Sequence, residues 1–188
     1  SIFVSGSAIQ WLRDEMKFFN SSSESEAFAR NADPHSGVFM VPSFTGLGAP
    51  YWDDKARGAI FGLTRGTTRE DITRATLDSL AYQTRDVLDA MVNDSGLPIA
   101  SLRVDGGASN NEYLMQFQSD LLQREIERPS LTETTALGAA HLAGLSVGFW
   151  KDRSEFVSSE ESSFYKPDMS REEADSYYAR WLKAVAAA

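Results

Sequence analysis

Short apolar stretches alternate with helical stretches through the second half of the chain. Residues 101–104 have the pattern of a strand and 110–122 that of a helix, and the same order repeats in 125–127 and 133–145. Strands that alternate with helices are typical of layered α/β domains, in which the helices cover a sheet. This order predicts an α/β fold.

The first half of the chain contains elements of both kinds. Residues 1–4 have the pattern of a strand end, and 7–19 have apolar residues at the three- and four-residue spacing of a helix. A short helix is predicted over 24–31. Two strands are predicted over 37–41 and 59–63, joined by an irregular loop rich in glycine.

Capping signals mark two further helices. Thr68 is a good N-cap residue, and Asp71 three positions later completes a variant of the capping box. The helix is predicted to run to Asn93, which gives it a length of ~40 Å. Ser170 begins the last helix with the same kind of signal, and residues 151–169 before it form a polar connector.

Two glycine turns could bind a ligand. The loop VDGGASNN joins a strand to a helix, at the end of the strand where open α/β sheets bind ligands. Gly106 and Gly107 have no Cβ to keep a ligand off the backbone, and the following helix start offers N–H groups to a phosphate or a purine. The other interpretation is a turn that needs glycine for its own geometry. Gly6 to Gln10 has a similar outline, although Gln10 alone fits a surface helix residue.

Catalytic and metal-binding patterns are weak. His35 and His141 have no nucleophile or carboxylate at a recognisable motif spacing, so we interpret both as structural. Asp53 and Asp54 could bind a metal, but a solvated loop is the better interpretation. We therefore predict no catalytic residue and no metal ligand in this chain.

The charge narrows the possible partners. The net charge is -9, and no cluster of Lys or Arg offsets it, which argues against nucleic acid. No apolar run approaches the ~20 residues of a membrane span. Cysteine is absent, and the start of the chain does not resemble a signal peptide, so a cytoplasmic location is expected.

One stretch carries a family resemblance. Residues 58–78, GAIFGLTRGTTREDITRATLD, resemble the second motif of the FGGY carbohydrate kinases. Every defined place of that motif is filled, by Gly58, Ile60, Gly62, Leu63, Asp71, Ile72, Ala75, Thr76, Leu77 and Asp78. Within the family, the stretches 7–16, 42–66, 81–91, 115–122 and 136–150 resemble glycerol kinases more than xylulose or gluconate kinases. The resemblance covers nearly the whole chain.

The resemblance implies a ribonuclease-H-like domain of the actin and hexokinase type, with a mixed sheet and helices on both of its faces. Such kinases have two of these domains around a cleft. Residues 1–188 would be part of the C-terminal domain of an ATP:glycerol 3-phosphotransferase. The N-terminal domain and the first strands of this domain are expected upstream of Ser1, which would leave an exposed sheet edge. The full protein is expected to form a homo-oligomer.

The resemblance also implies that the active site is shared between this chain and the N-terminal part of the longer protein. Gly6, Gln10, Gly107 and Asn111 match positions that contact ATP or ADP. The phosphate loop, the catalytic aspartate, the glycerol-binding residues and most of the Mg²⁺ site are expected in the N-terminal part, so the chain alone is expected to be inactive. Three alternatives stay open: another FGGY sugar or polyol kinase, a non-catalytic, actin-like nucleotide-binding module, and a simple α/β interaction domain.

Overall fold

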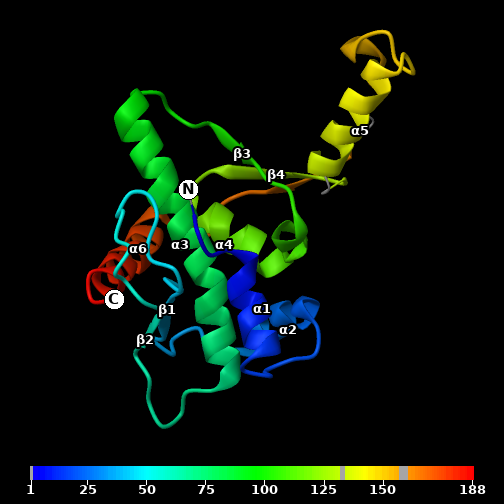
Figure 1. Ribbon diagram of the computed structural model, residues 1–188. Coiled ribbons are helices and arrows are strands. Elements are labelled where there is room, and N and C mark those ends of the chain that lie inside the picture. The colour runs from blue at the N-terminus through cyan, green and yellow to red at the C-terminus, as the bar shows by residue number, and fades with distance from the viewer. Residues whose placement is uncertain (1, 132–133, 157–160) are drawn as a thin grey trace.

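A computed structural model describes residues 2–131, 134–156 and 161–188 of the protein (Figure 1). Its helices and strands, in chain order, are α1 (Gly6–Asp14), α2 (Ser25–Asn31), β1 (Phe39–Val41), β2 (Ala59–Phe61), α3 (Arg69–Ser95), β3 (Ser101–Arg103), α4 (Glu112–Leu122), β4 (Glu125–Pro129), α5 (Thr134–Ser146), β5 (Ser162–Tyr165) and α6 (Arg171–Val185). Short 3₁₀ turns cover Ser22–Glu24, Gly107–Asn110 and Arg153–Glu155.

The main sheet is mixed, as predicted. Strand β3 pairs with β4 in parallel, with Leu102 opposite Ile126, and β4 pairs with β5 in antiparallel fashion, with Ile126 opposite Tyr165. The order is β3-β4-β5, so β3 lies at an edge of the sheet. Strands β1 and β2 form a separate antiparallel pair, in which Met40 lies opposite Ile60.

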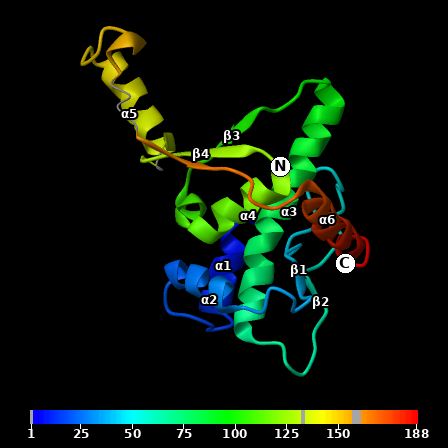
Figure 2. The same cartoon turned by 180° about the vertical axis from the view of Figure 1, so that it is seen from behind.

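Helix α3 lies at the centre of the molecule (Figures 1 and 2) and contacts α1, α2, α4 and β1. Helix α4 lies between α3 and the sheet, and α6 packs against α4. The core between them is apolar and aromatic. At its centre the ring of Tyr82 stacks on that of Trp181, with 5.1 Å between the ring centroids.

The start of α3 follows from local chemistry, and the predicted cap is confirmed. The Thr68 hydroxyl accepts the Asp71 N–H, and the Asp71 carboxylate accepts the Thr68 N–H. The same carboxylate accepts the N–H of Asp33 at 2.9 Å, which ties the loop after α2 to this helix. Gly96, with a φ of 69°, ends the helix in the left-handed conformation that glycine tolerates.

Buried Asp86 anchors α6 to α3. One oxygen of its carboxylate accepts the Tyr178 hydroxyl at 2.6 Å, and the other accepts the Trp181 indole N–H at 2.9 Å. Burial raises the pKa of Asp86, and these two hydrogen bonds oppose that rise. The two donors satisfy a polar group that would otherwise be costly to bury.

Three predictions of local structure are wrong. Residues 2–4 form no strand, since a strand needs a pairing partner and the described residues supply none for this segment. The first helix ends at Asp14, not at residue 19, because the chain turns at Lys17, where φ is 56°. The polar connector contains strand β5, which is held by its pairing with β4.

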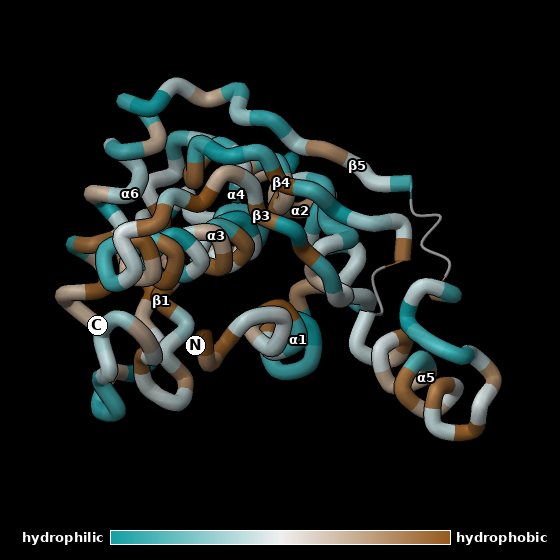
Figure 3. The backbone as a smooth tube through the Cα atoms, turned by 90° about the horizontal axis from the view of Figure 1, so that it is seen from above, coloured by the Kyte–Doolittle hydropathy of each residue, from teal (hydrophilic) through white to brown (hydrophobic). Residues whose placement is uncertain are grey.

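Helix α5 extends away from the body of the molecule (Figures 1 and 3). It is rich in alanine and glycine, and Val147 just beyond its end is 81% exposed. The sheet is covered by α4 on the face that carries Ile126 and Tyr165. Phe164, on the opposite face, is 57% exposed.

Candidate nucleotide site

A cavity of about 670 Å³ lies where α1, α2, α3 and the loop before α4 meet. Gly6, Gln10, Gly107 and Asn111 all line it, although about a hundred residues of sequence separate the first pair from the second. The two glycine turns identified in the sequence therefore form one site. The structure brings together every residue that the sequence predicts for nucleotide binding.

The glycines that line this cavity differ in whether their backbone conformation requires glycine. Gly106 has a φ of 83°, so it meets the requirement of the turn itself. Gly6 and Gly107 have no such angle, and a Cβ added at either would meet no protein atom within 4 Å. Neither backbone strain nor packing requires glycine there. What the two residues have in common is that both line the cavity and both have open space where a Cβ would lie.

The start of α4 is already occupied by side chains of the chain itself. The Asn111 side-chain oxygen accepts the Leu114 N–H at 2.9 Å, and its amide group donates to the Ser25 hydroxyl at 3.3 Å. The Glu112 N–H donates to the Glu26 carboxylate at 3.0 Å. The sequence left open whether this helix start would receive a phosphate or a purine. With Glu26 and Asn111 in place, the phosphate alternative is disfavoured.

The lining of the cavity points to the same chemistry. Its apolar part comes from Ile9, Leu77, Leu80 and Leu114, and its charged groups are the carboxylates of Glu26 and Asp105. None of the described lining residues is a lysine or an arginine. An apolar cleft with amide and hydroxyl groups at its rim suits the flat face and polar edges of a nucleoside. It does not suit a run of phosphates.

Helix α2 and the 3₁₀ turn before it contribute a wall that was not predicted from the sequence. Ser22, Ser23, Ser25 and Glu26 line the cavity, and Ser25 and Glu26 also hold the start of α4. The run SSSESE looks like a polar break between helices. No local signal distinguishes such a break from a cavity wall, because the role of these residues depends on contacts with α4, 86 positions away.

Two of the residues considered for catalysis or metal binding, Asp53 and His141, make structural contacts. Asp53 accepts the N–H groups of Lys55 and Ala56, which closes a turn. His141 stacks on Phe156 with 3.9 Å between the ring centroids, and His35 is exposed. Across the described ranges, no group of three or more His, Cys, Asp and Glu side chains is placed to hold a metal ion. None of the helices in the same ranges is both long and apolar enough to cross a membrane.

The sequence matches the family model for the C-terminal domain of the FGGY family of carbohydrate kinases over residues 1–147. The chain belongs to the FGGY family. It is 62% identical over 188 residues to the curated glycerol kinase of Pediococcus pentosaceus. That alignment takes in 100% of this chain and 37% of the relative, so the chain spans little more than a third of the length of that kinase.

Solved structures agree with this assignment. The crystal structure of Plasmodium falciparum glycerol kinase with ADP matches with a TM-score of 0.84 and 36% identity, covering 98% of this chain and 37% of that one. Ligand-bound xylulose kinase from Lactobacillus acidophilus, at 22% identity and a TM-score of 0.75, shows the same fold. The predicted ribonuclease-H-like α/β fold and the resemblance to glycerol kinases are both confirmed.

Proposed function

We propose that this chain is part of an ATP:glycerol 3-phosphotransferase and supplies the adenosine-binding side of its cleft. Residues 1–188 would then be part of its C-terminal domain. One observation carries the proposal: Gly6, Gln10, Gly107 and Asn111 line a single cavity, in which two glycines keep open space that the fold itself does not need. Similarity to glycerol kinases, one of them solved with ADP, supports the choice of nucleotide and of glycerol.

The remaining roles follow from what the cavity lacks. Phosphoryl transfer needs groups that neutralise the phosphates, a metal ion and a base that activates the acceptor hydroxyl. The described lining residues include no cation, and the described residues offer no metal cluster. We propose that the Mg²⁺-bound phosphates, glycerol and the catalytic base are held by the rest of a longer protein. A cytoplasmic location and a homo-oligomer belong to the same proposal.

Calorimetric titration of the chain with ADP and with adenosine tests the cavity. Both ligands should bind, with affinities within about tenfold of each other, because no lining cation contacts the phosphates. Gly107→Val should abolish binding by filling the cavity. Gly66→Val is the matched control, since Gly66 lies in a loop outside the cavity with its nearest atom at 3.8 Å. If the wild-type chain binds neither ligand at millimolar concentration, the nucleotide assignment is wrong.

A chimera tests the kinase assignment. The 188 matching residues of the Pediococcus pentosaceus glycerol kinase can be replaced by this chain, since the two align over that length at 62% identity. We expect glycerol-dependent formation of ADP by the chimera and none by the 188-residue chain alone. A folded but inactive chimera would contradict the proposed role, and so would glycerol-dependent turnover by the chain alone.

A further inference from the structure

A hydrogen bond joins α3 and α4, the two helices that supply Leu77, Leu80 and Leu114 to the cavity lining. The Tyr113 hydroxyl, in the first turn of α4, donates to the carboxylate of Asp78 in α3 at 2.7 Å. Asp78 is the last residue of the motif that identifies the family in the sequence, yet it does not line the cavity. The proposed nucleotide contacts therefore do not explain the role of this carboxylate.

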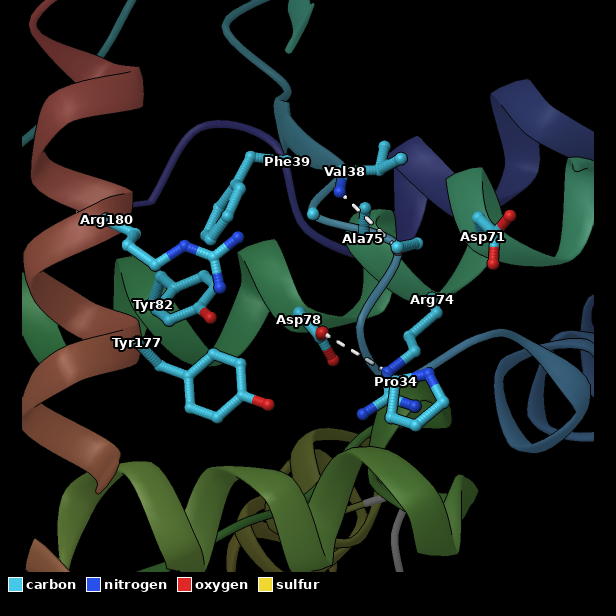
Figure 4. Close-up of a pocket in the computed structure, with 12 residues that line it drawn as sticks. Pro34, Val38, Phe39, Asp71, Arg74, Ala75, Asp78, Tyr82, Tyr177 and Arg180 are labelled. Carbon is cyan, nitrogen blue, oxygen red and sulfur yellow. Dashed lines mark hydrogen bonds and ion pairs between the residues drawn. The ribbon is translucent and has the colours of Figure 1, made fainter. Parts of the chain in front are cut away.

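The surroundings of Asp78 are polar but enclosed (Figure 4). Its side chain is 14% exposed, and the Arg74 guanidinium lies 3.8 Å from its second oxygen. The same guanidinium lies 5.4 Å from the centre of the Tyr113 ring. Burial raises the pKa of Asp78 to about 7, although the Tyr113 hydrogen bond and the charge of Arg74 both lower it. The other groups around this small polar pocket that can carry charge are Asp71, Tyr82, Tyr177 and Arg180.

The two residues joined by this bond are close in sequence to residues that line the cavity. Leu77 and Leu80, on either side of Asp78 in α3, form an apolar wall. Tyr113 follows Asn111 by two residues, and Asn111 ends the glycine loop that forms the facing wall. The Tyr113 ring is also fixed along α4, because it lies parallel to the ring of Phe117 at 6.2 Å. The bond therefore links the helix that carries the leucine wall to the helix that follows the glycine loop.

We propose that Asp78 and Tyr113 are positioning residues. They hold the glycine loop at the distance from Leu77 and Leu80 that fits a nucleoside between them. This inference rests on the proposed nucleotide function. Neither residue contacts the ligand. They act through α4, and their loss should lower affinity by allowing the loop to shift. A bond that served stability alone would leave affinity unchanged in the protein that remains folded.

The chain offers a matched control for this distinction. The Tyr178 hydroxyl also donates to a buried aspartate of α3, Asp86, at 2.6 Å, but the two lie away from the cavity. Tyr113→Phe and Tyr178→Phe each delete one phenol hydroxyl and orphan one carboxylate oxygen. Both should destabilise the fold to a similar degree. They should differ in their effect on ADP binding.

The experiment is calorimetric titration of the wild-type chain and these two variants with ADP. Tyr113→Phe should bind about three- to tenfold more weakly, as expected from a loss of the size of one hydrogen bond, whereas Tyr178→Phe should bind as the wild type does. Asp78→Leu should weaken binding like Tyr113→Phe. Asp78→Asn keeps an oxygen acceptor for the Tyr113 hydroxyl, so it should retain nearly full affinity.

A second measurement covers variants whose affinity is hard to determine. Backbone amides of residues 105–111 should exchange hydrogen faster in Tyr113→Phe and Asp78→Leu than in Tyr178→Phe. The inference is overturned if Tyr113→Phe binds ADP as tightly as the wild type, or if Tyr178→Phe loses as much affinity. In both cases the wild type still binds ADP, so the proposed function stands. Absence of binding by the wild type removes both.

Discussion

Replacing Asp71 by alanine removes one carboxylate that serves three donors at once. It is 4% exposed, and it accepts the Thr68 N–H, the Thr68 hydroxyl and the Asp33 N–H, each at 2.9 Å. The first two bonds begin α3, and the third holds the loop that follows α2. The alanine variant therefore loses the half of the capping box that Asp71 supplies and a link between two segments of the chain, while the Thr68 hydroxyl can still accept the N–H of residue 71.

The magnitude follows from these contacts. A hydrogen bond to a charged group contributes about 1.5–3 kcal/mol, and both lost N–H bonds are part-buried, so we take the low end of that range for each. With the Asp33 and Thr68 N–H groups both deprived of their acceptor, we expect a loss of about 3 kcal/mol in the free energy of unfolding. That is a large fraction of the roughly 5–15 kcal/mol that stabilises a typical domain.

Urea unfolding of the chain at pH 7 measures this loss. Glu70→Ala is the matched control, because Glu70 is the neighbouring acid and its salt-bridge partner Arg69 is 57% exposed. The control should change the free energy of unfolding by less than about 0.5 kcal/mol. A loss below about 1 kcal/mol in Asp71→Ala would refute the reasoning, since it would mean that the three donors find other acceptors or water.

The effect should also depend on pH. Burial raises the pKa of Asp71, but the hydrogen bonds from Thr68 and Asp33 outweigh burial, and the pKa is lowered overall. A lowered pKa gives stability that is present above the pKa of the unfolded chain and is lost as the pH falls below it. The difference between wild type and Asp71→Ala should therefore shrink below about pH 4.

Three further substitutions test other parts of the structure. Gly62→Ala should lower the free energy of unfolding by at least about 2 kcal/mol, because Gly62 has a φ of 81° and a Cβ there would collide with the carbonyl of Gly37. The control Gly66→Ala should change it little. Trp181→Phe should cost about 2–4 kcal/mol, since it deprives the buried Asp86 of one donor, and Trp52→Phe on the exposed loop should be nearly neutral. Asp78→Asn should change the pH dependence of stability. The raised pKa of about 7 means that wild type loses stability relative to the variant as the pH rises from about 4 to about 7, by on the order of 4 kcal/mol, and no further above that. Urea unfolding at a series of pH values checks all three, and parallel curves for wild type and Asp78→Asn would contradict the last.

Elements defined by local chemistry were predictable from the sequence. The starts of α3 and α6 could be placed because the cap residues Thr68 and Ser170 each accept an N–H three positions away. Strand β5 was missed because its position depends on pairing with β4, and Tyr165 is its one buried side chain. A four-residue strand of this kind has too little pattern of its own to be read from sequence.

The candidate site was also predictable only in part from the sequence. Each glycine turn was visible as a strand or turn leading into a helix, and the family resemblance named Gly6, Gln10, Gly107 and Asn111. That the turns face each other across Leu77 and Leu80 depends on the packing of α1 and α4 on α3, which no local pattern expresses. Glu26 was missed for the same reason, since its carboxylate acts on Glu112.

Glu26 bears on how an acidic chain could bind an anionic ligand. The net charge of -9 and the carboxylates of Glu26 and Asp105 in the cavity oppose phosphate, and Glu26 occupies the helix start where a phosphate would gain most. The nucleoside is uncharged, so these carboxylates cost its binding little and can accept its hydroxyl or amine groups. If the chain binds a nucleotide as proposed, the acidic lining favours one orientation, with the nucleoside inside the cavity and the phosphates directed away from α4. In that orientation, open space at Gly6 and Gly107 matters more to affinity than any charge that this chain provides.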